Sequence, residues 1–166
     1  MNTIASRLSK MVLAGILIVR SIAAGAEPPA LSSAAGRAAA ARLTESNRRI
    51  VEQFVDAFYR RKNVREAFMS FVAVDYVQHN PTIADGREAA IAALEPMFSR
   101  PEAQFDVKRI LVDGNLAAVH LHGRPSADAP GGAVVDLFRL EGGKIVEHWD
   151  VLQPMPSHAA NAHPMF

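Results

Sequence analysis

The sequence contains no cysteine, which excludes disulfide bonds and thiolate chemistry. It also lacks an excess of either charge, because 18 basic residues stand against 17 acidic ones and the formal net charge is +1. Such a balance provides no electrostatic attraction for nucleic acid, so no nucleic-acid partner is expected. The sequence has no phosphate-binding loop, no cofactor motif and no internal repeat. Its 166 residues are enough for one domain with a sizeable core.

The N-terminus contains an apolar run that is shorter than a membrane-spanning segment. Arg7 and Lys10 precede the apolar residues 11–19, and residues 24–26 are small enough for a cleavage site. This pattern predicts a signal peptide at residues 1–26 and a periplasmic or secreted protein. The alternative is a disordered tail or a mis-set start codon. Because the run is too short to cross a bilayer, we expect no membrane association after cleavage.

Two segments flank the predicted domain. Residues 27–43 are rich in alanine, serine and proline, which predicts a linker with some helical character and no core face. Residues 155–166 follow the last strand pattern and contain prolines, which predicts a flexible tail. The domain itself is expected at residues 44–154.

Hydrophobic periodicity divides this domain into helices followed by strands. Thr44 is the expected N-cap of the first helix, and a short strand is expected at residues 75–80. The three expected helices lie at residues 44–62, 64–72 and 87–98. The four later strands are expected at residues 104–112, 116–124, 134–140 and 145–152. Because the helices are segregated from an antiparallel meander, the fold class is α+β.

The last two strands form a hairpin that carries ionisable residues on a predicted core face. Its adjacent glycines, residues 142–143, supply the positive φ angles that a tight turn needs. Strand alternation places Asp136 on the same side as Phe138, and His148 on the same side as Asp150. Ionisable groups on a core face cost free energy unless they are paired or used in function. The hairpin therefore indicates a functional site.

Two segments of the sequence resemble a known family. YVQHNPTIADGREA, at residues 76–89, and VDLFRLEGGKIVEHWDVLQ, at residues 135–153, resemble the SnoaL-like proteins of the nuclear transport factor 2-like superfamily. That group includes polyketide cyclases and predicted aldol-condensing enzymes. The resemblance covers about residues 44–154. It implies a cone-shaped fold in which three N-terminal helices pack on a curved, mostly antiparallel sheet and leave a pocket.

The resemblance implies a catalytic carboxylate at Asp136, working as acid or base beside a histidine one strand back, which matches His122. The hairpin arithmetic agrees, because a loop centred near Ala129 places His122 directly across from Asp136. A carboxylate beside an imidazole in an apolar cone can titrate nearer to neutral pH, which proton abstraction next to a carbonyl requires. The alternative is a buried pair that only satisfies its own hydrogen bonds.

Other residues match positions that line the pocket of the same fold. A bulged turn would set His148 across from Asp136, and His120 shares a face with His122 because it lies two residues away. The same bulge turns Trp149 to the outer face of the sheet, where similar proteins commonly dimerise. A homodimer through that face is therefore predicted. The expected substrate-binding residues are Phe54, His79, His120, Phe138, His148 and Asp150.

Two of these positions argue against steroid isomerisation. His79 falls near the position where ketosteroid isomerases carry their base, and Phe54 falls near their oxyanion tyrosine. A phenyl ring cannot donate a hydrogen bond to an oxyanion. Isomerisation of steroids is therefore not expected, although His79 could still orient a substrate carbonyl.

We expect a cofactor-free enzyme that carries out acid/base chemistry next to a carbonyl, of the aldol-condensation, cyclase or isomerase type, on a small apolar carbonyl-containing ligand. No metal is expected, because two histidines on one strand are common by chance and the resembling enzymes use no cofactor. The alternatives are a periplasmic ligand-binding module and a dimeric assembly domain. An open pocket favours the enzyme or the ligand-binding module, and a pocket filled by phenylalanine and methionine favours the assembly domain.

Overall fold

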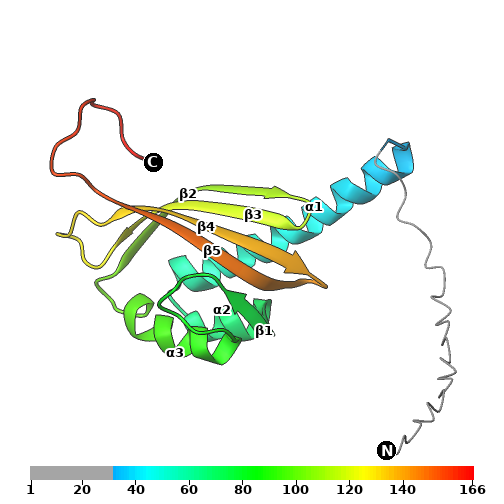
Figure 1. Ribbon diagram of the computed structural model, residues 1–166, viewed down its shortest axis with the longest axis horizontal. Helices are drawn as coiled ribbons and strands as arrows, with labels where there is room; N and C mark the ends of the chain where they lie inside the picture. Colours follow the sequence, from blue (N-terminus) through cyan, green and yellow to red (C-terminus); the bar gives the residue numbers. More distant parts are fainter. Residues whose placement is uncertain (1–31) are drawn as a thin grey trace, which may run out of the picture.

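The computed structural model describes residues 32–166, and its elements follow the expected order (Figure 1). The predicted signal peptide, residues 1–26, lies outside the described residues. The helical elements are α1 (Ala34–Val55), the π-helical turn η1 (Asp56–Arg60), α2 (Val64–Phe71) and α3 (Arg87–Phe98). The strands are β1 (Val72–Gln78), β2 (Gln104–Asp113), β3 (Leu116–Arg124), β4 (Gly132–Glu141) and β5 (Lys144–Pro154). The predicted α+β class is confirmed.

The first helix begins well before the predicted Thr44. Its N-cap is Ser33, whose hydroxyl accepts a hydrogen bond from the Gly36 amide at 2.9 Å. The stretch that follows is rich in alanine, the residue most favourable in a helix, so the predicted linker is helical from Ala34 onward. Thr44 has another role, because its hydroxyl accepts a hydrogen bond from the Gly114 amide in the β2–β3 turn at 2.9 Å.

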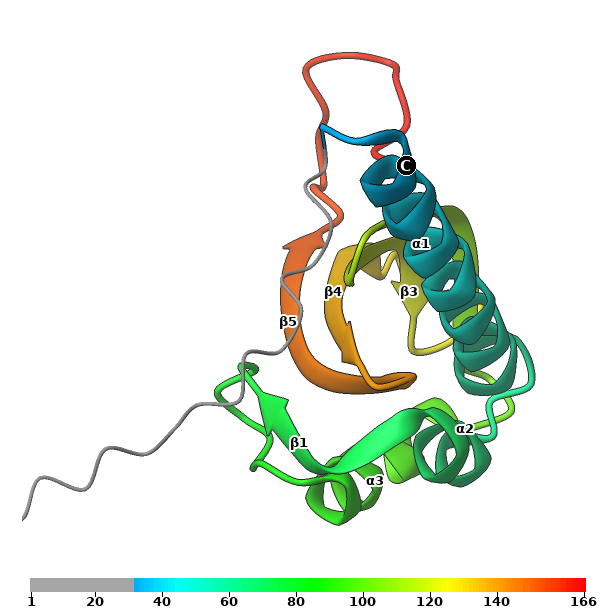
Figure 2. The same ribbon diagram turned by 90° about the vertical axis from the view of Figure 1, so that its right-hand side faces the viewer.

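The five strands form one curved sheet in the order β1-β5-β4-β3-β2. Strand β1 runs parallel to β5, and the other three pairings are antiparallel. Figure 2 shows α1 across the concave side of the sheet, with α2, α3 and β1 at one end. This arrangement is the expected cone, in which the helices cover the inner face and leave the outer face free.

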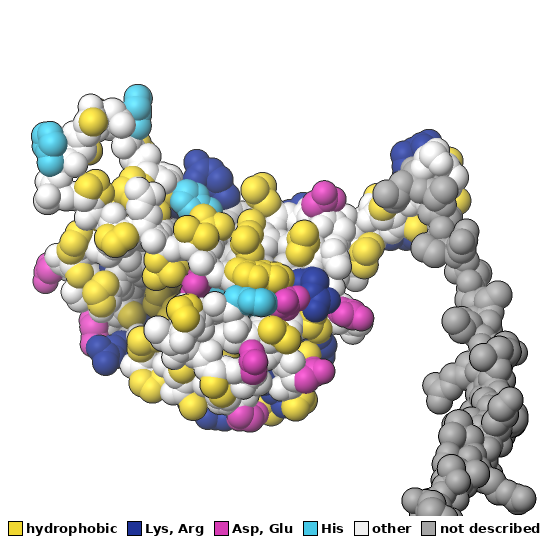
Figure 3. Space-filling model, viewed as in Figure 1, with side chains coloured by type: hydrophobic (Ala, Val, Ile, Leu, Met, Phe, Trp, Pro, Cys, Tyr) yellow, Lys and Arg dark blue, Asp and Glu magenta, His cyan; other side chains and the backbone are white. Residues whose placement is uncertain are grey.

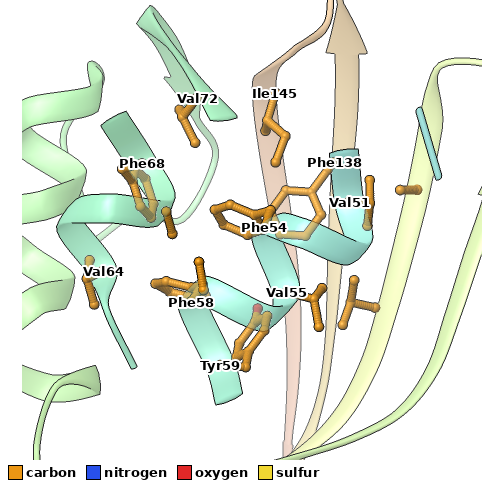
Figure 4. Packing of buried hydrophobic residues seen from close by; sticks show 14 of the residues in the cluster. Val51, Phe54, Val55, Phe58, Tyr59, Val64, Phe68, Val72, Phe138 and Ile145 are labelled. Atoms are coloured by element: carbon orange, nitrogen blue, oxygen red, sulfur yellow. The ribbon is translucent and has the colours of Figure 1, made fainter. Parts of the chain in front are cut away.

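The aromatic core lies between α1, α2 and the concave face. Val51, Phe54, Val55 and Phe58 recur at three- and four-residue spacing on α1 and η1, and all four are buried. The Phe54 ring meets the Phe138 ring of β4 edge-on, with centroids 5.4 Å apart (Figure 4). Burying a side chain of this size contributes about 1.5–3 kcal/mol, so the helix packs here through its apolar face.

The outer face of the sheet carries exposed apolar side chains. Leu111 of β2, Leu137 of β4 and Val151 of β5 are exposed, and Trp149 is the cross-strand partner of Leu137. Figure 3 shows hydrophobic side chains scattered over this side of the molecule. The predicted homodimer through this face stays a prediction. None of the helices within residues 32–166 is long and apolar enough to cross a membrane.

The C-terminal segment, residues 155–166, contains neither helix nor strand and loops back beside the sheet (Figure 1). Its last residue, Phe166, stacks on the ring of His122 with centroids 4.3 Å apart. The Lys108 ammonium also lies 5.4 Å from the centre of the Phe166 ring. The end of the chain thus covers one part of the outer face.

Asn47 ties α1 to the sheet, and its removal should destabilise the fold. Its side-chain amide donates to the Gly114 carbonyl at 2.8 Å, and the residue is buried. We expect Asn47→Ala to lower the free energy of unfolding by about 1–3 kcal/mol, because the carbonyl loses its partner. Urea denaturation would measure the change. Arg49→Ala is the control: it breaks only an exposed ion pair with Glu45, so a loss as large as that of Asn47→Ala would contradict the assignment.

Candidate functional site

The concave face and the helices enclose a cavity of about 290 Å³. Most of its wall is apolar and rich in aromatic rings, and the polar groups are few and lie on β1, the loop after it, β4, β5 and η1. The aromatic lining residues are Phe54, Phe58, Tyr59, Phe68, Tyr76, Phe98, Phe105 and Phe138. The polar lining residues are Gln78, Asn80, Thr82, Asp136, His148 and Asp150. An apolar cavity with a few convergent polar groups is typical of a small-molecule site.

Asp136 is the central polar group of the cavity. Its carboxylate is only 7% exposed, and both of its oxygens are engaged. The Tyr59 hydroxyl donates to Oδ2, and His148 Nε2 lies 3.0 Å from Oδ1. A buried carboxylate is costly unless it is paired and hydrogen-bonded, and these two partners meet that requirement. His148 and Asp136 lie on one face, as the sequence predicted under the assumption of a bulged turn.

The hydrogen bonds around Gln78 fix the protonation of His148. The backbone amide of Asn80 donates to Gln78 Oε1 at 2.9 Å, so this atom is the amide oxygen. His148 Nδ1 lies 2.8 Å from the same oxygen and must therefore carry a proton. With Nδ1 protonated, a neutral ring would turn a bare Nε2 lone pair toward the Asp136 oxygen. Two acceptors do not approach to 3.0 Å, so we infer that one proton lies between His148 and Asp136.

Asp150 is the second carboxylate of the cavity. It is the cross-strand partner of Asp136, because β5 has an irregularity beside Leu140 that shifts the pairing. The Asn80 amide donates to Asp150 Oδ2 at 2.6 Å, and within residues 32–166 Oδ1 has no hydrogen bond. The predicted bulged three-residue turn is wrong, because Glu141 pairs with Lys144 across a two-residue turn. The irregularity lies within the strands instead, and it sets Asp150 across from Asp136 and His148 across from Phe138. His148 reaches Asp136 diagonally.

Three side chains could hold a metal ion. Asp136, His148 and Asp150 each offer a ligand atom, and these atoms lie within 4.8 Å of one another. Ligands about 2.0–2.2 Å from a zinc ion would lie somewhat closer together than this. The Nδ1–H of His148 already donates to Gln78, as the free nitrogen of a metal-bound histidine commonly does. The chemistry of the donor set therefore fits a cation as well as a shared proton.

Both tyrosines at the site are kept protonated by their surroundings. Burial raises the pKa of Tyr59 well above its usual value, and the negative charge of Asp136 raises it further. Burial is also the main cause of the raised pKa of Tyr76, with a second contribution from Asp136. Tyr59 therefore acts as a neutral hydrogen-bond donor in the cavity over the whole physiological pH range.

The predicted partnership of His122 with Asp136 is wrong. Asp136 pairs with Val119, and His122 pairs with Ala133. This register differs from the predicted one by three residues, an odd number, so His122 points to the opposite face of the sheet. Its Nε2 bonds the Pro130 carbonyl at 2.8 Å, outside the cavity. The error arose because the β3–β4 loop is centred before the predicted Ala129.

Two further histidines are also outside the cavity. His120 lies across from Val135 on the outer face and bonds a guanidinium nitrogen of Arg109 at 3.1 Å. His79 is exposed; its Nε2 lies 2.8 Å from a Glu147 oxygen, and its ring stacks on Trp149 with centroids 4.7 Å apart. Their expected role in substrate binding is therefore not compatible with the structure.

Four of the expected residues do line the cavity: Phe54, Phe138, His148 and Asp150. Tyr59, Gln78 and Asn80 also line the cavity and were not predicted from the sequence. Gln78 and Asn80 flank His79, so strand alternation based on the apolar Tyr76 would have selected them. Tyr59 lies four residues after the buried Val55, a spacing that places it on the inward side of the helix.

Comparison with known proteins agrees with this fold. The SnoaL-like domain model matches residues 51–148. A nuclear transport factor 2-like protein of unknown function from Mesorhizobium loti is 24% identical, with a TM-score of 0.58 over 66% of this chain and 93% of that one. A search of curated proteins finds no significant match.

Two further solved structures are similar. A candidate ketosteroid isomerase from Kribbella flavida is 23% identical, with a TM-score of 0.57 over 73% of this chain and 92% of that one. A candidate SnoaL-like polyketide cyclase from a Jannaschia species is 20% identical, with a TM-score of 0.53 over 66% and 87%. Because these identities are below 25%, the likenesses establish the fold and no activity.

The fold and the aromatic cavity define a nuclear transport factor 2-like protein. Within that superfamily the matched domain covers more than half of the sequence, so the chain belongs to the SnoaL-like family. The family contains many unrelated functions, and the activity has to be argued from the site.

The raised pKa values predict how the tyrosines titrate. The chain has only two tyrosines, Tyr59 and Tyr76. We expect the folded protein to show no tyrosinate absorbance up to about pH 11, whereas the urea-unfolded chain should ionise both near pH 10. Because the folded pKa values are raised, the free energy of unfolding is unaffected below pH 10 and falls as the pH rises above it. Native ionisation of one tyrosine near pH 10 would contradict the burial of the pair, and Tyr59→Phe would show which one.

Proposed function

We propose that this protein is an acid/base enzyme that moves a proton at the carbon next to a carbonyl group in a small apolar ligand. The observation that carries the proposal is the 3.0 Å contact between His148 Nε2 and Asp136 Oδ1, beside a second carboxylate, Asp150. A site that holds one acidic and one basic group within a few ångströms can remove a proton from the carbon next to a carbonyl and donate one to the carbonyl oxygen.

Asp150 is the better candidate for the base. Its Oδ1 is unengaged among the described residues, whereas both oxygens of Asp136 already have partners. In the proposed step Oδ1 takes the proton from the carbon next to the carbonyl. The C–H electron pair forms a C=C bond, and the carbonyl π electrons move to the oxygen. The Asn80 amide holds the other oxygen of Asp150 and orients the carboxylate.

The Asp136–His148 pair supplies the acid. It gives its shared proton to the developing enolate oxygen, and Tyr59 remains a neutral donor to Asp136 throughout. Gln78 holds Nδ1–H, so the proton that moves is the one at Nε2. This arrangement replaces His122 with His148 as the partner of Asp136. Return of the proton from Asp150 to a different carbon of the conjugated enol, with loss of the O–H proton back to the pair, gives isomerisation, and attack of the enolate on a second carbonyl gives condensation.

The same fold allows two alternative functions. A domain used only for assembly should have its cone filled by side chains, and the cavity of about 290 Å³ counts against that function. A binding module would need the same cavity without chemistry. Only turnover separates that module from an enzyme.

Hydrogen exchange provides a test that does not require the natural substrate. We expect the protein to accelerate exchange of the acidic C–H of β-tetralone, a small apolar ketone, in deuterated water, as followed by proton NMR. Asp150→Asn should slow this exchange by about 100-fold or more, the usual contribution of a general base. Asp136→Asn should also slow it, because the pair loses its acid.

Asp106→Asn is the matched control. This exposed carboxylate bonds Lys108 on β2 at 2.6 Å and does not line the cavity, so exchange should be unchanged. Exchange at the wild-type rate in Asp150→Asn would exclude Asp150 as the base. Binding of β-tetralone without any accelerated exchange would favour the binding module.

A further inference from the structure

A second hollow of about 360 Å³ adjoins the cavity. The two share six lining residues, which are Met97, Phe98, Phe105, Gly123, Val134 and Leu152. Met97 is 51% exposed and Leu152 is 62% exposed, whereas Asp136 and His148 at the other end are 7% and 8% exposed. The second hollow therefore lies toward the surface, and we call it the outer hollow.

The two spaces differ in charge. The cavity is lined by the carboxylates of Asp136 and Asp150 and by no lysine or arginine of the described chain. The outer hollow is lined by Arg100 and Arg124 and, over the same residues 32–166, by no acidic side chain. A ligand that spans both spaces thus meets negative charge at the buried end and positive charge at the exposed end.

The two arginines differ in how firmly they are held. Arg124 donates to the Gln104 side chain and to the Ala127 carbonyl, which fixes its guanidinium beside the hollow. Arg100 donates only its Nε, to the Pro96 carbonyl at 3.0 Å. Within the described chain, its two terminal nitrogens have no hydrogen-bond partner and face solvent. They can therefore receive an anionic group.

We propose that the ligand of this site is an amphipathic anion, with an apolar body in the aromatic cavity and its charged group at Arg100 and Arg124. The inference rests on the proposed function only in placing an uncharged carbonyl at the buried end. An anion cannot be placed at that end, because Asp136 and Asp150 would repel it in apolar surroundings. The apolar body lies along the stacked rings of Phe98 and Phe105, whose centroids are 4.5 Å apart.

Two dyes with the same apolar body test the charge preference. Anilinonaphthalene sulfonate is an anion, and N-phenylnaphthylamine is the same body without the sulfonate. We expect Arg100→Gln and Arg124→Gln each to weaken fluorescence-detected binding of the sulfonate by about two- to fivefold, the usual effect of a partly exposed ion pair. Binding of the neutral dye should be unchanged. Arg109→Gln, on the outer face, is the control and should affect neither dye.

Gly123 allows the dyes to be localised. A Cβ atom added there meets Val134, Leu121 and Phe105 atoms only at 3.7–3.9 Å, which is ordinary contact, so the first atom of the new side chain in Gly123→Leu causes no clash. Because Gly123 lines both spaces, this variant should weaken binding of both dyes. Unchanged binding of both would place them elsewhere and overturn the site. Equal effects of the arginine variants on the two dyes, or no effect, would overturn the preference for an anion. None of these results depends on proton transfer, which the exchange experiment tests separately.

Discussion

The buried carboxylate of Asp136 is the constraint on which the rest of the site depends. It lies on the concave face of a sheet whose other inward residues are mostly apolar, and it keeps its place only because Tyr59 and His148 both bond it. Removing one partner of such a buried pair typically costs about 3–5 kcal/mol. Gln78 then holds His148, and Asn80 holds both Gln78 and Asp150. The polar network is therefore continuous from the helix to the edge strand.

Two backbone irregularities bring this network together. The irregularity in β5 beside Leu140 sets Asp150 rather than Trp149 across from Asp136 and keeps His148 on the same face. The π-helical turn η1 occurs where α1 ends, and it carries Tyr59 into the cavity. Such turns are frequent at functional sites, since they change the direction of one side chain without breaking the helix. Neither feature has a dependable signal in the sequence.

The sequence predicted those parts of the structure that depend on local patterns. Helix α3 was predicted at its observed bounds from the turn at Asp85 and Gly86 that precedes it, and the turn at Gly142 and Gly143 has the expected positive φ angles. The site required pairing between strands. His122 was misplaced because an irregular loop of seven residues, 125–131, does not fix a register as a two-residue turn does. Gln78 and Asn80 were not predicted, because they face the cavity whereas His79 between them, the residue expected at the site, faces away from it.

The chemical identity of the site follows from what surrounds the carboxylates as much as from the carboxylates themselves. Among the described residues that line the cavity, no lysine or arginine neutralises Asp136 and Asp150, so a proton held with His148 or a metal ion has to balance the charge. The hydrogen bond of Gln78 holds the proton on Nδ1 and leaves Nε2 of His148 facing Asp136, where it can share a proton with the carboxylate or bind a cation. A proton held in this way is available for transfer, whereas a structural ion pair of the same composition would need no adjoining cavity. The open space beside Asp150 is thus the feature that argues for chemistry over stability.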